Sequence, residues 1–123
     1  MKEEMTLKEI QKYQKGFDEK YFKVFWKGKE KGGIDWKLYM LNYMTIALTG
    51  ELGEFANIMK KINREKDTLG EYPDEKEFED LKEELTDCFI YLIILSNILE
   101  MDLEKEFIKK LRFNEQRFQK YLK

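Results

Sequence analysis

A single proline interrupts the chain of 123 residues, and this scarcity limits the folds that the chain can adopt. Proline and glycine form most tight turns, and only seven glycines accompany Pro73. Apolar residues recur at intervals of three and four over long stretches, which is the spacing of an amphipathic helix. The sequence therefore predicts an all-α protein with long helices and short connections.

Four helical stretches are expected from this spacing and from residues that begin and end helices. Thr6 and Glu9 have the spacing of a capping box at the start of the first stretch. Glycines at 28, 32 and 33 end that stretch, and the loop 68–73 separates the second from the third. The residues expected at the four starts are Thr6, Asp35, Pro73 and Asp102. The expected ends lie near Phe25, within 63–67, near Leu99 and near Leu122.

Four helices with short connections favour a bundle of four to five helices. The chain has the length of one domain, and we expect residues 1–123 to form it. The third stretch is apolar nearly all round between Cys88 and Leu99, and such a helix needs partners on several sides. We therefore expect a homo-oligomer, either a homodimer or a homotetramer.

The composition excludes several classes of chemistry. The chain has no histidine, which excludes a histidine general base, a nucleophile paired with histidine and a histidine-ligated zinc site. Its 23 Lys and Arg nearly balance its 25 Asp and Glu, so no nucleic-acid partner is expected. The longest apolar run, residues 88–95, is too short to span a membrane. With one cysteine, Cys88, we expect a cytoplasmic protein without a membrane partner.

Two acidic pairs interrupt apolar stripes on the expected second and third helices. Glu51 and Glu54 share a face with apolar residues, and Glu84 and Asp87 repeat the arrangement. Buried carboxylates need a positive charge beside them, and no Lys or Arg falls on these stretches of stripe. Oxygen ligands without His or Cys favour Mg²⁺, with Mn²⁺ as a substitute. Alternatively, the four acids lie exposed at the stripe margins and pair with surface lysines.

The residues around these acids resemble a known family. Segments 47–54 (ALTGELGE) and 84–92 (ELTDCFIYL) are similar to the E-x-x-E and E-x-x-D metal blocks of the MazG-like, all-α nucleoside triphosphate pyrophosphohydrolases. That family includes dimeric dUTPases and dCTP pyrophosphatases. Segment 110–118 (KLRFNEQRF) is similar to its K-x-x-x-N-x-x-R-[YF] block, and the resemblance covers roughly residues 36–118.

The resemblance implies an activity and roles for individual residues. The ligands of Mg²⁺ would be Glu51, Glu54, Glu84 and Asp87. One of the two acids on the second helix would also orient or deprotonate the attacking water, and Glu54 is preferred over Glu51 for this role. A nucleoside triphosphate would then become a monophosphate and pyrophosphate, which would clear the nucleotide pool of unwanted members. Tyr91 follows Asp87 by one helical turn and matches the family's tyrosine near the nucleotide.

Further residues are candidates for binding the triphosphate. Lys110, Asn114 and Arg117, here called the phosphate clamp, are spaced to share one helix face, although a solvated basic face is the alternative. Lys61 lies about two turns beyond Glu54. There it either contacts phosphate or only stabilises the end of the helix through its positive charge. Trp36 either contacts the base or packs on the first helix.

Two other functions remain open on the sequence alone. One is a non-catalytic helical module that uses the same fold to bind other proteins. The other is a metal-dependent hydrolase that attacks the terminal phosphate and releases orthophosphate. The four intact acids favour a pyrophosphohydrolase over the non-catalytic module, and product analysis would separate the two hydrolases.

Overall fold

The computed structural model of the chain describes residues 1–122. It describes the side chains of all these residues except 30 and 31. Lys123, the last residue of the expected domain, lies outside the described residues. Within 1–122 the regular structure is helical throughout, which confirms the all-α class. The helices are α1 (Leu7–Tyr21), α2 (Lys23–Trp26), α3 (Lys29–Leu69), α4 (Glu75–Ile98) and α5 (Leu103–Arg117), followed by the 3-10 helix η1 (Gln119–Tyr121).

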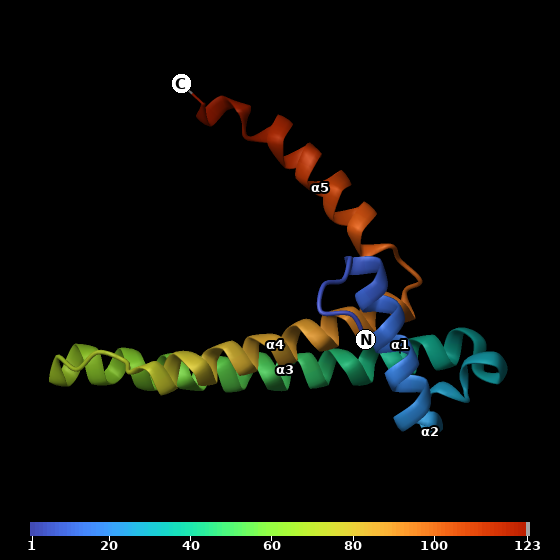
Figure 1. Ribbon diagram of the computed structural model, residues 1–123, viewed down its shortest axis with the longest axis horizontal. Helices are drawn as coiled ribbons and strands as arrows, with labels where there is room; N and C mark the ends of the chain where they lie inside the picture. The colour runs from blue at the N-terminus through green and yellow to red at the C-terminus, as the bar shows by residue number, and fades with distance from the viewer. Residues whose placement is uncertain (123) are drawn as a thin grey trace.

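The helices α3 and α4 form a long antiparallel hairpin, and the N-terminal helices lie at one end of it (Figure 1). There α1 packs against α4, and α2 contacts α3. The helix α5 leaves the corner after α4 and points away from the hairpin (Figure 1). No helix in the described part of the chain has both the length and the apolar character needed to cross a membrane.

Two of the expected helix starts are confirmed. At α1 the amide of Glu9 donates to the Thr6 hydroxyl at 3.2 Å, and the Thr6 amide donates to the Glu9 carboxylate at 3.2 Å. These paired bonds satisfy amides that the first turn of a helix leaves free. At α5 the Asp102 carboxylate accepts from the amide of Lys105 at 3.1 Å. Both caps could be predicted because they depend only on residues three positions apart.

The other two starts lie near the predicted residues. Gly33 has non-helical backbone angles (φ 51°, ψ −128°), so α3 consists of two helical parts that meet in a kink there, and Asp35 lies two residues after the kink, close to the start of the longer part. At α4 the capping residue is Asp74 and not Pro73: its carboxylate accepts from the Glu77 amide at 2.8 Å. Proline has no side-chain acceptor for that amide, so the adjacent aspartate fixes the start.

One break inside the first stretch and one helix end differ from the prediction. The first stretch divides into α1 and α2, because Phe22 leaves helical geometry (φ −123°, ψ 45°) while its amide still donates to the Asp18 carbonyl at 2.8 Å. The helix α3 continues to Leu69, beyond the predicted end, and stops where Gly70 adopts a left-handed conformation (φ 69°). Glycine adopts that conformation without a Cβ clash, so it ends α3 at low cost.

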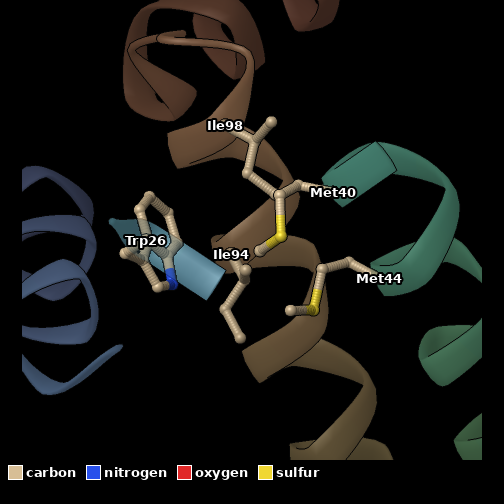
Figure 2. Close-up of a cluster of buried hydrophobic side chains, with 5 residues drawn as sticks. All are labelled: Trp26, Met40, Met44, Ile94 and Ile98. Atoms are coloured by element: carbon tan, nitrogen blue, oxygen red, sulfur yellow. The ribbon is translucent and has the colours of Figure 1, made fainter. Parts of the chain in front are cut away.

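The buried core lies where α2, α3 and α4 meet. Figure 2 shows its side chains pointing toward one another from these three helices, and they are Trp26, Met40, Met44, Ile94 and Ile98. Trp36 packs beside this cluster, and its indole N–H donates to the Phe25 carbonyl at 2.5 Å. The core therefore fixes α2 against the hairpin.

Candidate active site

The α3–α4 hairpin brings three of the four predicted metal ligands together. Glu51 and Glu54 are three residues apart on α3, and Glu84 lies on α4, which packs along it. Each offers one carboxylate oxygen, and the three oxygens lie within 4.8 Å of one another. Glu51 and Glu84 are half-buried, whereas Glu54 is exposed.

The electrostatics of this cluster fit a divalent cation. One oxygen of Glu51 and one of Glu84 are buried without a hydrogen-bond partner among the described residues. Burial, together with the side chains of Glu51 and Glu54, raises the pKa of Glu84 to about 7. Unpaired buried carboxylate oxygens are costly, and a hard cation with oxygen ligands would satisfy all three groups. The residues present therefore suit Mg²⁺ or Mn²⁺, which oxygen ligands favour.

The fourth predicted ligand lies beside this group and outside it. Asp87 is half-buried on α4 and lines a cavity together with Glu51 and Tyr91. Its neighbour Cys88 is buried, and burial raises the pKa of the Cys88 thiol, with the charges of Glu51 and Glu84 acting in the same direction. The thiol therefore stays protonated near neutral pH and is a poor nucleophile there.

This cavity has a volume of about 350 Å³, which lies in the range of small-molecule sites. Its lining comes from α1, α2, α3 and α4 and from Phe22 between the first two helices. Acidic groups and aromatic rings both face it, an arrangement suited to a ligand with a charged part and a flat part. The aromatic lining residues are Phe17, Phe22, Phe25, Trp26, Tyr43 and Tyr91.

The predicted nucleotide contacts on the hairpin have different surroundings. Tyr91 lines the cavity, where burial raises the pKa of its phenol and the charges of Glu51 and Asp87 raise it further. Trp36 lies in the packing beside the core, in edge contact with Trp26 at 5.5 Å between ring centroids. Lys61 is exposed on α3.

The phosphate clamp lies on α5, which points away from the hairpin (Figure 1). Lys110 and Arg117 are exposed, and their cationic groups lie 4.9 and 5.9 Å from the centre of the Phe113 ring. The side-chain oxygen of Asn114 is buried without a hydrogen-bond partner among the described residues. The fold of one chain therefore does not carry the clamp to the carboxylates.

The sequence reasoning missed two polar residues of the cavity. Gln14 and Asp18 on α1 line it, and Asp18 is buried with 3% of its surface exposed. Their spacing of four residues, with Gln11 three residues earlier, places three polar side chains on one face of the helix. That pattern is a usable signal, because a polar group on a helix face that packs inward needs a specific partner.

Comparison with known proteins identifies the class to which this fold and site belong. The family model of the MazG nucleotide pyrophosphohydrolase domain matches residues 41–118, which include all four predicted metal ligands and the phosphate clamp. The chain belongs to this family. The match confirms the family predicted from the three sequence blocks.

Two individual proteins are similar to the chain. The dCTP pyrophosphatase 1 of Rattus norvegicus is 34% identical over 90 residues, which cover 72% of this chain and 52% of that protein. The Gene 37 protein of Mycobacterium phage L5 is 44% identical over 61 residues, which cover 50% of this chain and 51% of that protein. The chain thus spans about half the length of these relatives.

Proposed function

We propose that the chain hydrolyses a nucleoside triphosphate to the monophosphate and pyrophosphate in a Mg²⁺-dependent reaction that removes unwanted nucleotides from the pool. The observation that carries this proposal is the group of three carboxylate oxygens within 4.8 Å of one another. One member of that group, Glu51, also lines the aromatic cavity, so a metal-bound phosphate and a stacked base would lie side by side.

The burial of the three acids suggests a division of roles. Glu51 and Glu84 each bury one unpartnered oxygen and would hold the cation, with Asp87 as the fourth ligand. Glu54 is exposed, so water reaches it most easily, and it would orient the attacking water and accept its proton. Bound Mg²⁺ would supply charge neutralisation on the phosphates and a lowered pKa of water. Mn²⁺ would serve as a substitute.

The remaining predicted residues would bind the rest of the nucleotide. Tyr91 lines the cavity and would contact the nucleoside directly. Trp36 would act through its edge contact with Trp26, which lines the same cavity. Lys61 is exposed on the same helix as Glu54 and would attract the triphosphate.

We further propose that the protein works as a homo-oligomer, a dimer or a dimer of dimers. On α4, Leu85, Phe89 and Leu92 follow one another by four and three residues and are each at least 40% exposed. On α5, Phe107 and Leu111 form a second exposed apolar face with Phe118, the residue that follows the helix. A second copy would cover these faces and bring the cations of one α5 to the carboxylates of the other chain.

The decisive experiment is product analysis with a panel of ribo- and deoxyribonucleoside triphosphates and Mg²⁺. We expect pyrophosphate release that falls at least 100-fold in Glu54→Gln, a loss typical of removing a group used in the transition state. The matched control is Glu65→Gln, which removes an acid from α3 outside the carboxylate group. Water labelled with ¹⁸O should place the label in the monophosphate, because the attack is at the α-phosphorus.

The same experiment tests the alternatives. Orthophosphate with a diphosphate product would contradict the proposal in favour of attack at the terminal phosphate. Folded protein that binds Mg²⁺ and releases nothing from any triphosphate would favour the non-catalytic interaction module.

Mixing two inactive variants tests the shared site. Glu84→Gln damages the carboxylate group, and the double variant Lys110→Ala with Arg117→Ala damages the phosphate clamp. If the clamp acts across copies, a mixed dimer contains one site with both parts intact, and activity returns to a substantial fraction of wild type. Activity that stays at the level of the separate variants after subunit exchange would contradict the shared site. Light scattering measures the oligomeric state directly.

Two broader expectations belong to the same proposal. Residues 1–123 would act as one domain, since α1 and α2 complete the cavity that α3 and α4 begin. A cytoplasmic location is supported by Cys88, which is a free and buried thiol.

A further inference from the structure

A buried glutamine joins three helices at the corner of the molecule. Gln11 on α1 is 8% exposed, and its side-chain amide donates at 2.9 Å to the hydroxyl of Ser96 on α4, a residue that is 3% exposed. The side-chain amide of Asn97 donates at 3.0 Å to the backbone carbonyl of Gln11. A buried polar side chain with several partners fixes the segments that carry them, because each group left unpaired would cost free energy.

Gln11 also holds the start of α5. Its Nε2 donates to the carbonyl of Met101 at 2.9 Å, and its Oε1 accepts from the amide of Leu103 at 3.1 Å. These two backbone groups flank Asp102, the residue that caps α5. In the same connection Glu100 has a φ of 55°, which residues other than glycine rarely adopt, so surrounding contacts must hold it. The side chain of Gln11 therefore places the first turn of α5 relative to α1.

Beyond this corner α5 has little other support from its own chain. None of the residues Leu103–Arg117 is buried by the described part of the chain, and the helix points away from the hairpin (Figure 1). A helix rises about 1.5 Å per residue, which puts Arg117 about 21 Å beyond Leu103. A rotation of about 10° at the corner would therefore move Arg117 by about 4 Å, more than the length of a hydrogen bond. Small changes at Gln11 thus become large displacements at the phosphate clamp.

We propose that Gln11 is a positioning residue for the phosphate clamp. It sets the direction in which α5 leaves one chain and so the place where Lys110 and Arg117 meet the carboxylates of a second copy. This inference rests on the shared site of the proposed function. Gln11 precedes residues 41–118, so it adds to the site a residue that the family match does not cover.

Distances between spin labels test the direction of α5 without turnover. The labels are attached to Lys60→Cys on α3 and Gln116→Cys on α5, both exposed positions, in a chain that carries Cys88→Ser. Excess unlabelled protein ensures that only distances within one chain are measured. We expect one narrow distribution for the wild type, and a shift or broadening of several Å in Gln11→Met, because methionine fills the space but makes none of the hydrogen bonds.

The matched control for the distances is Ser96→Ala. It removes the hydrogen bond from Gln11 to α4 and leaves those to Met101 and Leu103, so it should lower stability and keep the wild-type distances. Unchanged distances in Gln11→Met overturn the inference. So does an equal change in Ser96→Ala, which would show that any loss in this network moves α5.

Activity in mixed copies provides a second test. One chain carries Lys110→Ala with Arg117→Ala and supplies the carboxylates, and the other carries Glu84→Gln and supplies the clamp. Gln11→Met is added to one chain or to the other. We expect kcat/KM to fall at least about 10-fold when it is on the chain that supplies the clamp. The fall should be smaller on the chain that supplies the carboxylates, because α1 still packs against α4 there.

This comparison separates positioning from a general loss of stability. A loss of stability lowers both mixtures alike, whereas positioning of the clamp depends on which chain carries Gln11→Met. Equal falls, or a larger fall on the chain that supplies the carboxylates, overturn the inference. No recovery of activity in the mixture without Gln11→Met contradicts the shared site of the proposed function, and the spin-label distances then decide separately whether Gln11 directs α5.

Discussion

The side-chain amide of Gln11 on α1 donates a hydrogen bond to the hydroxyl of Ser96 on α4 at 2.9 Å, although the two residues lie 85 positions apart. The same amide nitrogen lies 2.9 Å from the carbonyl oxygen of Met101, and the side-chain oxygen of Gln11 accepts from the amide of Leu103 at 3.1 Å. Gln11 therefore ties α1 to the end of α4 and to the start of α5. Because α1 carries Gln14 and Asp18, this contact also positions one side of the cavity.

Replacing Gln11 should destabilise the protein more than an ordinary surface change. Gln11→Ala removes every hydrogen bond of the Gln11 side chain and leaves buried groups unpaired, so we expect a loss of roughly 2–4 kcal/mol in the free energy of unfolding. Urea denaturation measures this loss. Lys12→Ala, at the exposed neighbouring position, is the control and should change it by less than about 0.5 kcal/mol. Equal effects of the two substitutions would contradict the anchoring role.

A divalent cation should stabilise the folded protein through the carboxylate group. Mg²⁺ at about 100 times its dissociation constant should add roughly 2.7 kcal/mol to the free energy of unfolding. Glu51→Gln should abolish most of this gain, because one buried ligand oxygen is lost. The measurement is thermal unfolding with Mg²⁺ and then with excess EDTA. A gain of the same size in Glu51→Gln would place the cation elsewhere.

The stability of the protein should depend on pH through Asp18. Burial raises the pKa of Asp18 from an ordinary 3.8 to about 6, against the opposing hydrogen bond from Gln14. Between these two pH values the folded state binds more protons than the unfolded state, so the free energy of unfolding falls as pH rises. Relative to Asp18→Asn, the wild type should lose on the order of 2 kcal/mol between about pH 4 and pH 7. Parallel pH profiles for the two proteins would show that Asp18 titrates normally.

Replacing each of two glycines by alanine should change the free energy of unfolding in opposite directions. Gly70 ends α3 in a left-handed conformation (φ 69°), and a Cβ there would meet no heavy atom within 4 Å among the described residues. Gly70→Ala should therefore cost about 1 kcal/mol through backbone strain alone. Gly16 lies within α1 with equally open surroundings, so Gly16→Ala should stabilise by about 0.5–1 kcal/mol. Chemical denaturation of both variants tests the pair, and a stabilising Gly70→Ala would contradict the assigned backbone conformation.

The positions of the proposed metal ligands on their helices could be predicted, because they depend only on residues a few positions apart. The spacing of Glu51 and Glu54 fixes them on one face of a helix, whatever that helix packs against. The predicted second helix ended too early, yet this error did not move the two acids off their shared face. Caps such as Thr6 with Glu9 were predictable for the same reason.

The sequence by itself determined the helical class and which residues share a helix face, as Glu51 and Glu54 do, because helical periodicity relates residues only a few positions apart. That Glu84 meets these two acids depends on α4 packing along α3. Only the tertiary structure decided that Asp18 would join the cavity and that the phosphate clamp would point away from it. Asp18 depends on how α1 docks against α4, and the clamp depends on the direction of α5 after the turn at Glu100, which has a positive φ of 55°. Contacts between distant segments set both, and no local spacing encodes them.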